Sequence, residues 1–247
     1  MAETRRFALV TGAAGGLGLA TARILLSRGF GVTMVDVDGD RLEAAAGGLG
    51  SAAHLLPADL ARTSECDRVV AAALAQWGIV DVLVNCAAIL HRVDLFELDE
   101  ETFGRIVDTN VRSVIWLCRG VLPHMERAGY GRIVNVSSVG IHTGGYSTTS
   151  AVYELTKAGI ANLTKTLARA YATKGILVNT VAPGAMRTRM ILDETPASVL
   201  AEVEQDIPIG RLADPAEVGE VVAFLASDAN TYVTGATVDA NGGLVMP

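Results

Sequence analysis

Seven short apolar runs, separated by longer stretches with helical periodicity, limit the folds open to this chain of 247 residues. Six of the seven runs are nearly continuously hydrophobic, whereas a strand with one face in water alternates apolar and polar residues. The runs therefore predict parallel strands that are buried on both faces. They are FALVTG (7–12), GVTMVDVD (31–38), AAHLLPADL (52–60), VDVLVN (80–85), GRIVNVSS (131–138), ILVNTVAPG (176–184) and ATVDANGG (236–243).

Two of the intervening stretches carry helix-start signals: Asp99 followed by Glu101, and Asp214-Pro215 followed by Glu217. Strict alternation of strand and helix predicts right-handed crossovers between parallel strands. We therefore expect an α/β fold, a single-domain Rossmann-type doubly wound parallel sheet of about seven strands with helices on both faces, spanning 1–247. The predicted helices cover 16–28, 39–47, 63–77, 99–127, 151–173 and 214–226.

Segment 185–213 is the longest one without a clear strand pattern, and its prolines and charged residues predict short helices. It follows the carboxyl end of a predicted strand. Because ligands bind at these ends in doubly wound sheets, we expect the segment to form a lid over a small-molecule substrate.

Composition narrows the range of partners. Half of the residues are hydrophobic, and the formal net charge is −7 with no local run of Lys and Arg. Nucleic acid is therefore not an expected partner, since phosphate binding requires a basic surface. Three widely spaced cysteines indicate free thiols in a reducing compartment, and the four dispersed histidines do not suggest a metal site.

The first residues, MAETRRFALVTG, pass directly from charged residues into an apolar run and lack the features of a signal peptide. No apolar stretch approaches the roughly 20 residues that span a bilayer. We expect a soluble, cytoplasmic protein that does not bind a membrane.

A glycine-rich segment, TGAAGGLG (11–18), follows the first predicted strand and leads into a helix. Gly12, Gly16 and Gly18 allow a tight turn and a close approach of the backbone to a ligand. The helix start offers free N–H groups and the positive end of its dipole to a pyrophosphate. A strand before the glycines and a helix after them favour a dinucleotide site.

Asp36 ends the second predicted strand, about 20 residues beyond the glycines, where a carboxylate accepts hydrogen bonds from the adenosine ribose. A carboxylate there repels a 2′-phosphate, and no arginine lies in the glycine segment or immediately beside Asp36. The pattern favours NAD over NADP. The alternative is that Asp36 is an ordinary turn residue at a strand end.

Tyr153 and Lys157 lie four residues apart, which places them on one face of a helix. Most such pairs are surface neighbours. Lowering the pKa of tyrosine from about 10 to about 7 requires roughly 4 kcal/mol. A lysine ammonium about 4 Å away supplies up to roughly that amount, so Lys157 can make Tyr153 an acid/base catalyst.

The chain resembles the short-chain dehydrogenases/reductases over essentially its whole length, because it carries TGAAGGLG, VNCAA, GRIVNVSS, Tyr153-x-x-x-Lys157 and VNTVAPG in that order. The resemblance implies NAD as cofactor and a catalytic tetrad of Asn110, Ser138, Tyr153 and Lys157. It also implies a cofactor site made of Gly12, Gly16, Leu17, Gly18, Asp36, Asp59, Leu60, Asn85, Tyr153, Lys157, Met186 and Thr188.

Within that resemblance, Ser138 hydrogen-bonds the substrate oxygen and steadies its developing charge, and Asn110 holds a water that relays protons to Lys157. Subunit pairing through the helices at 99–127 and 151–173 is implied as well, giving a homotetramer. Both helices are apolar on more than one side; tight packing on the sheet is the alternative explanation.

Two departures from the family pattern stand out. The usual Asn-Asn-Ala-Gly is here Asn85-Cys86-Ala87-Ala88, a change in residues that brace the sheet. The loop between Ser138 and Tyr153 is longer than is common in the family. Ser137 is an alternative to Ser138. Tyr146 is excluded as the catalytic tyrosine because Ser150 stands where its lysine belongs.

The sequence thus predicts an NAD-dependent oxidoreductase that interconverts a secondary alcohol and a ketone, with a sugar, polyol or hydroxy acid as substrate. One alternative is a 3-oxoacyl thioester reductase, although such reductases commonly use NADPH. Another is a nucleotide-binding regulator without turnover. The loops at 90–96, 139–150 and 185–210 are expected to line the substrate pocket, where Arg187 and Arg189 are candidates to meet an anionic group.

Overall fold

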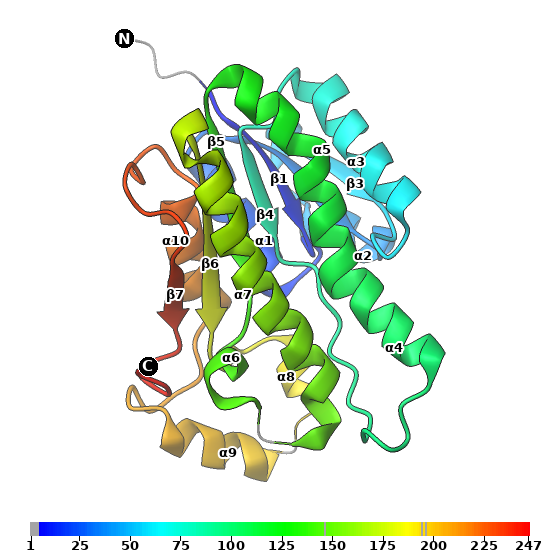
Figure 1. The fold of residues 1–247 in the computed structure, drawn as a ribbon, viewed down its shortest axis with the longest axis vertical. Coiled ribbons are helices and arrows are strands. Elements are labelled where there is room, and N and C mark those ends of the chain that lie inside the picture. Colours follow the sequence, from blue (N-terminus) through cyan, green and yellow to red (C-terminus); the bar gives the residue numbers. More distant parts are fainter. Residues whose placement is uncertain (1–4, 146, 194, 196) are drawn as a thin grey trace.

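The computed structural model describes residues 5–145, 147–193, 195 and 197–247. Seven parallel strands form one sheet in the order β3-β2-β1-β4-β5-β6-β7 (Figure 1). This topology confirms the predicted doubly wound sheet, and each of the seven apolar runs contains a strand. The strands are β1 (Phe7–Thr11), β2 (Gly31–Asp36), β3 (Ala53–Pro57), β4 (Val82–Asn85), β5 (Gly131–Val136), β6 (Ile176–Pro183) and β7 (Thr237–Ala240).

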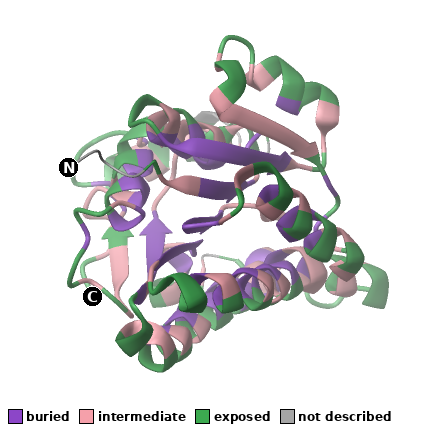
Figure 2. Cartoon of the chain, turned by 90° about the horizontal axis from the view of Figure 1, so that it is seen from above, coloured by how far each residue is buried: buried purple, intermediate pink, exposed green. Residues whose placement is uncertain are grey.

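Helices cover both faces of the sheet. On one face lie α3 (Thr63–Trp77), α5 (Ser113–Ala128) and α7 (Ala151–Tyr171). On the other lie α1 (Gly16–Ser27), α2 (Gly39–Ala45) and α10 (Pro215–Leu225). The central strands are buried between the two layers (Figure 2), which explains why their sequences are hydrophobic without alternation.

Both helix-start signals are confirmed. The Asp99 carboxylate accepts a hydrogen bond from the Thr102 N–H at 2.7 Å, and α4 begins at the next residue. Asp214 and Glu217 form a complete capping box at the start of α10. The predicted helix at 99–127 is divided into α4 (Glu100–Val107), a π-helical turn (Asp108–Arg112) and α5.

The predicted short helices of segment 185–213 are present as α8 (Arg189–Leu192) and α9 (Ala197–Asp206), beyond the carboxyl ends of the strands (Figure 1). α6 (Gly140–Thr143) lies at the same end of the sheet. No helix in the described part of the chain is long and apolar enough to cross a membrane.

Candidate active site

A cavity of about 1540 Å³ lies at the carboxyl ends of the strands. Its wall includes residues that end or directly follow β1 to β6, as expected for a doubly wound sheet, together with residues of α1, α4, α7, α8 and α9. Twelve of the predicted site residues line it: Gly12, Gly16, Leu17, Gly18, Asp36, Asp59, Leu60, Ser138, Tyr153, Lys157, Met186 and Thr188. The structure therefore brings the glycine turn and the Tyr-Lys pair to one cavity.

The glycine turn has a backbone that only glycine suits. Gly12 and Gly16 adopt φ values of 66° and 50°, and a Cβ on Gly18 would overlap the carbonyl oxygen of Gly12. α1 starts in this turn with Gly15 as its N-cap, and no side chain in the described part of the chain caps its first N–H groups. These groups fit the pyrophosphate of a dinucleotide, because they combine free donors with the positive end of a helix dipole.

Asp36 is held rigidly at the end of β2. Its Oδ2 accepts a hydrogen bond from the Ala14 N–H at 3.0 Å, and its Oδ1 accepts one from the Asp38 N–H at 3.2 Å. Each carboxylate oxygen can accept more than one hydrogen bond. Asp36 therefore presents acceptors to the cavity beside the glycine turn, a fit for the hydroxyl groups of a ribose.

Arg41 is a residue that sequence reasoning missed. The first turn of α2 brings its guanidinium over the glycine turn, with Nη2 3.0 Å from the position of a Cβ on Gly15. Its Nε lies 3.8 Å from Asp38 Oδ2. No arginine is adjacent to Asp36 in the sequence, as expected. Arg41 lies five positions later, but α2 brings it to the cavity that Asp36 also lines.

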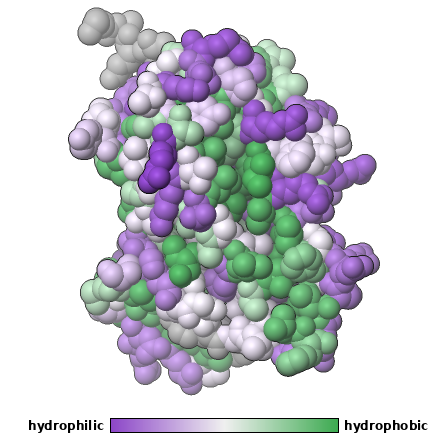
Figure 3. All heavy atoms as spheres, in the orientation of Figure 1, coloured by the Kyte–Doolittle hydropathy of each residue, from purple (hydrophilic) through white to green (hydrophobic). Residues whose placement is uncertain are grey.

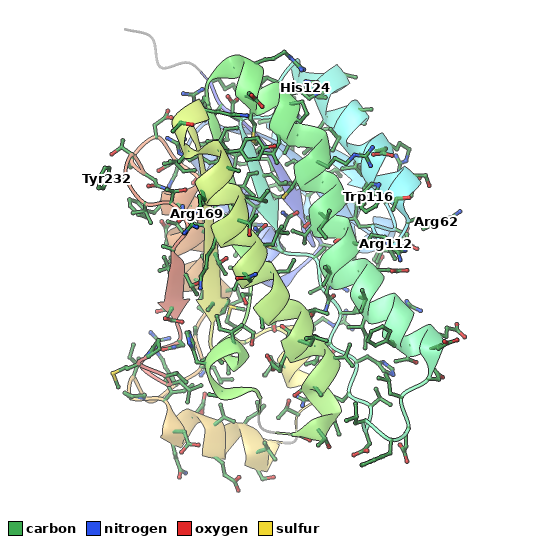
Figure 4. All side chains as sticks on the ribbon, viewed as in Figure 1. Arg62, Arg112, Trp116, His124, Arg169 and Tyr232 are labelled. Atoms are coloured by element: carbon green, nitrogen blue, oxygen red, sulfur yellow. The ribbon has the colours of Figure 1, made fainter. Side chains whose placement is uncertain are left out.

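A second arginine on the cavity wall has a different orientation. Arg62 precedes α3, and its side chain points outward from the start of that helix (Figure 4). Arg62 is exposed. Arg41, by contrast, places its guanidinium against the glycine turn.

The segment after β4 is braced to β1. Thr11 Oγ1 accepts hydrogen bonds from the N–H groups of Cys86 and Ala87, at 3.1 and 3.0 Å. The Asn85 side chain is buried in the sheet and donates from Nδ2 to Asn135 Oδ1 at 2.8 Å. The contact of Asn85 with a ribose remains a prediction, while Cys86, which replaces the usual second asparagine, lies on the cavity wall.

Lys157 is buried on α7, and its Nζ donates a hydrogen bond to the Val136 carbonyl oxygen at 2.8 Å. The same Nζ lies 5.5 Å from the centroid of the Tyr153 ring, so the two side chains share one face of the helix as predicted. Burial lowers the pKa of Lys157 to about 8, because the charged ammonium loses its hydration.

Tyr153 requires a correction. Burial raises the pKa of its hydroxyl above the ordinary value, and the neighbouring Glu154 carboxylate acts in the same direction. The predicted lowering to about 7 is therefore wrong for the protein chain by itself, since desolvation and the neighbouring carboxylate both disfavour the phenolate.

The two serines after β5 have different surroundings. Ser137 is buried, and its hydroxyl donates a hydrogen bond to the Lys157 carbonyl oxygen at 2.8 Å. Both serines line the cavity, but Ser138 is only half-buried, and its Oγ accepts a hydrogen bond from the Gly140 N–H at 3.0 Å. This arrangement favours Ser138 over Ser137 as the serine that meets a ligand. Tyr146 lies outside the described residues.

Asn110 lies in the π-helical turn and is buried. Its Oδ1 accepts a hydrogen bond from the Ile89 N–H at 2.9 Å, and its Nδ2 donates to the Ile89 carbonyl oxygen and to Thr156 Oγ1. Asn110 therefore links the segment after β4 to α7. Its partner on α7, Thr156, directly precedes Lys157. Its predicted role in holding a water remains a prediction.

Met186 and Thr188 follow β6 and line the cavity. The Thr188 N–H donates to the Met186 carbonyl oxygen at 2.8 Å, and Thr188 Cγ2 lies 3.3 Å from the position of a Cβ on Gly16. The two lid arginines pair within their own segment: Arg187 with Glu204 and Arg189 with Asp193.

Known proteins resemble this chain over nearly its whole length. The family model described as enoyl-(acyl carrier protein) reductase matches residues 12–245. A relative from Sinomonas cyclohexanicum, cis-4-hydroxycyclohexanecarboxylate dehydrogenase, is 41% identical, with 98% of this chain and 97% of the relative covered.

Two solved structures from Brucella melitensis are similar as well. One is a short-chain dehydrogenase/reductase described as a glucose/ribitol dehydrogenase, with a TM-score of 0.90, 32% identity, and coverage of 98% of this chain and 97% of that one. The other is a 3-ketoacyl-(acyl-carrier-protein) reductase complexed with NADH, with a TM-score of 0.89, 33% identity, and coverage of 97% and 98%. The chain therefore belongs to the short-chain dehydrogenase/reductase family of oxidoreductases.

Proposed function

We propose that the protein is an NAD-preferring oxidoreductase that interconverts a secondary alcohol and a ketone. The observation that carries this proposal is the shared cavity, which Ser138, Tyr153 and Lys157 line together with the glycine turn and Asp36. A nucleotide held at one end of such a cavity is positioned to react with a substrate at the other.

A nicotinamide cofactor is supported by family membership and by the relative that binds NADH. The glycine turn and the start of α1 would hold its pyrophosphate, Asp36 its ribose, and Met186 and Thr188 its carboxamide. When bound, the nicotinamide supplies the acceptor or donor for a hydride. Asp36 carries the proposed preference for NAD, because a carboxylate repels a 2′-phosphate.

Oxidation of an alcohol requires that a hydride leave the carbon and a proton leave the oxygen. Tyr153 takes the proton as its phenolate, and Ser138 donates a hydrogen bond to the substrate oxygen. Burial raises the pKa of Tyr153, so the phenolate depends on nearby positive charge. Lys157 supplies such a charge below its pKa of about 8, and the cationic ring of NAD+ adds to it.

We propose a sugar, polyol or hydroxy acid as substrate. The relative that acts on a hydroxycyclohexanecarboxylate favours a hydroxy acid whose carboxylate is remote from the hydroxyl. A second candidate, reduction of a 3-oxoacyl thioester, is favoured by the similar 3-ketoacyl-(acyl-carrier-protein) reductase. The segment 185–213 acts as the lid in either reaction.

Initial rates at 340 nm test the proposal. The oxidation panel contains cis-4-hydroxycyclohexanecarboxylate, polyols and simple secondary alcohols with NAD+ or NADP+, and the reduction panel contains a 3-oxoacyl thioester with NADH or NADPH. We expect NAD-linked oxidation of at least one alcohol. Turnover of the thioester alone would favour the second candidate, and NADH binding without any turnover would favour a nucleotide-binding regulator.

We also propose a homotetramer. Apolar side chains collect along the middle of the face covered by α4, α5 and α7 (Figure 3), and Phe103, Ile115 and Leu155 from these helices are exposed. Covering such a surface in water is favourable. Size-exclusion chromatography with light scattering should give a mass four times that of the chain, and a monomer would contradict this proposal.

A further inference from the structure

Arginines line the cavity at several points, and most of them are committed to other groups. They are Arg41, Arg62, Arg92, Arg105, Arg187 and Arg189. Arg187 and Arg189 pair with carboxylates of the lid, so neither is a free cation. Arg41 lies against the glycine turn, and Arg62 points outward (Figure 4). Arg92 and Arg105 remain as candidates to meet an anionic substrate group.

Arg92 lies in the segment between β4 and α4, and hydrogen bonds hold this segment on both sides of it. Ile89 exchanges two hydrogen bonds with the buried Asn110 side chain, at 2.9 and 3.0 Å. The Val93 N–H donates to the Thr149 carbonyl oxygen at 3.1 Å. Thr149 lies two residues before α7, the helix that carries the proposed acid/base residue. The backbone of Arg92 is therefore held beside the start of that helix.

The side chain of Arg92 faces the reaction end of the cavity. Leu90 and Arg92 line the cavity, whereas His91 between them lies outside its wall. Burial raises the pKa of Glu154, the neighbour of Tyr153, and nearby positive groups oppose this rise, with Arg92 among them. Arg92 is also exposed, so a ligand that enters the cavity can reach its guanidinium.

The guanidinium of Arg92 is available for a ligand. Its side chain forms no ion pair and no hydrogen bond among residues 5–145, 147–193, 195 and 197–247. Arg105, in contrast, has Glu101 as an acidic neighbour one turn earlier on α4. A guanidinium presents a planar fork of donors that matches a carboxylate. A carboxylate bound inside the cavity also displaces water, and a partly buried pair is screened less than an exposed one.

We infer that Arg92 is a specificity-determining residue that binds the carboxylate of a hydroxy acid, while Ser138 and Tyr153 hold its reacting carbinol. This inference rests on the proposed alcohol oxidation and narrows its substrate class to organic acids. Arg92 forms no hydrogen bond with Ser138 or Tyr153, and it belongs to a different segment of the wall. A ligand that meets all three residues therefore carries its carboxylate away from the carbinol.

Two probes that differ in charge and share a ring and a carbinol test the inference: cis-4-hydroxycyclohexanecarboxylate and its carboxamide. Values of kcat/KM are measured as NADH formation at saturating NAD+ for the wild type and for Arg92→Gln. We expect the wild type to prefer the acid and the ratio of acid to amide to fall about tenfold in the variant. Arg92→Lys keeps the charge without the planar fork, so its ratio should lie between the two.

Arg62→Gln is the matched control, because it removes the same charge from the cavity wall at a side chain that points outward (Figure 4). Its ratio of acid to amide should equal that of the wild type. Arg105→Gln tests the other candidate arginine in the same assay. A lower ratio in Arg105→Gln, with the wild-type ratio in Arg92→Gln, would overturn the inference and assign the carboxylate to α4.

A binding measurement separates recognition from turnover. Cyclohexanecarboxylate, which lacks the reacting hydroxyl, is titrated into the NADH-saturated protein by calorimetry. Its Kd should be about tenfold higher for Arg92→Gln than for the wild type and for Arg62→Gln. Equal affinity in the wild type and Arg92→Gln would contradict the inference.

A wild type that oxidises the amide as efficiently as the acid would also overturn the inference, and so would one that oxidises other alcohols of the panel but neither probe. Both results would leave the proposed function intact. Absence of turnover with both probes and every alcohol of the oxidation panel would instead remove the proposed function, and the inference with it.

Discussion

The two ends of the cavity are built in different ways. At the nucleotide end, glycines close together in the sequence shape the backbone, and the Asp36 carboxylate is fixed by backbone N–H groups. At the other end, Ser138 from the segment after β5 meets Tyr153, Glu154 and Lys157 from α7. Here burial shifts the pKa of the tyrosine, the glutamate and the lysine.

This difference suits the nucleotide end to cofactor binding and the other end to proton transfer. A backbone cradle with free N–H donors holds a ligand and keeps its shape, because it contains no group that must change protonation. Buried titratable side chains are costly for the fold and are typical of sites that move protons. Substitutions at the two ends should therefore have different effects on cofactor binding and on turnover.

The largest effect is expected from Tyr153→Phe, which removes the hydroxyl that would exchange the proton. Turnover should fall by about 10³-fold, while NADH affinity measured by fluorescence titration changes little. Tyr171→Phe, at the end of the same helix, serves as the control. Turnover that survives in Tyr153→Phe would show that another residue exchanges the proton.

At the nucleotide end, Gly18→Ala should weaken NADH binding by about 100-fold and lower the free energy of unfolding by about 2 kcal/mol, because its Cβ overlaps the Gly12 carbonyl oxygen. Fluorescence titration and urea denaturation measure the two quantities. Gly159→Ala provides the control, because a Cβ there meets nothing within 4 Å. Wild-type affinity in Gly18→Ala would contradict the role assigned to the glycine turn.

A pH-dependent effect on stability should come from Lys157 at the reaction end. Its pKa is lowered to about 8 in the folded chain, whereas the ordinary value is 10.5. Between these values the unfolded chain binds more protons at this residue, so the free energy of unfolding contributed by Lys157 rises with pH across this window.

Urea denaturation of the wild type and Lys157→Met between pH 7 and pH 10.5 measures this contribution. The wild type should gain up to about 3 kcal/mol over the variant as the pH rises through the window, since one pKa unit corresponds to about 1.4 kcal/mol. A constant difference between the two proteins would mean that Lys157 titrates at its ordinary pKa.

The smallest effects should appear in the choice between NAD and NADP. Asp36→Asn removes the charge that repels a 2′-phosphate and should lower the KM for NADP+ by about tenfold. Arg41→Ala removes the guanidinium above the glycine turn and should raise that KM by a similar factor. Steady-state kinetics with both cofactors check these shifts, and an unchanged preference in Asp36→Asn would locate the selection elsewhere.

Much of the fold followed from the sequence, because parallel strands buried on both faces require nearly continuous apolar runs and because caps such as Asp99 and Asp214 act locally. The glycine turn and the spacing of Tyr153 and Lys157 are local in the same sense. The π-helical turn around Asn110 was not predictable from helical periodicity, and within it the Asn110 side chain contacts Ile89 in a different segment of the chain.

The sequence by itself thus determined the order of strands and helices, the phosphate-binding turn and the face shared by Tyr153 and Lys157. Only the tertiary structure decided which groups surround each of them. Burial raised the pKa of Tyr153 against the prediction, α2 brought Arg41 to the glycine turn, and hydrogen bonds to distant segments held Arg92 beside α7. Desolvation and close packing depend on segments distant in the chain, so local spacing cannot reveal them.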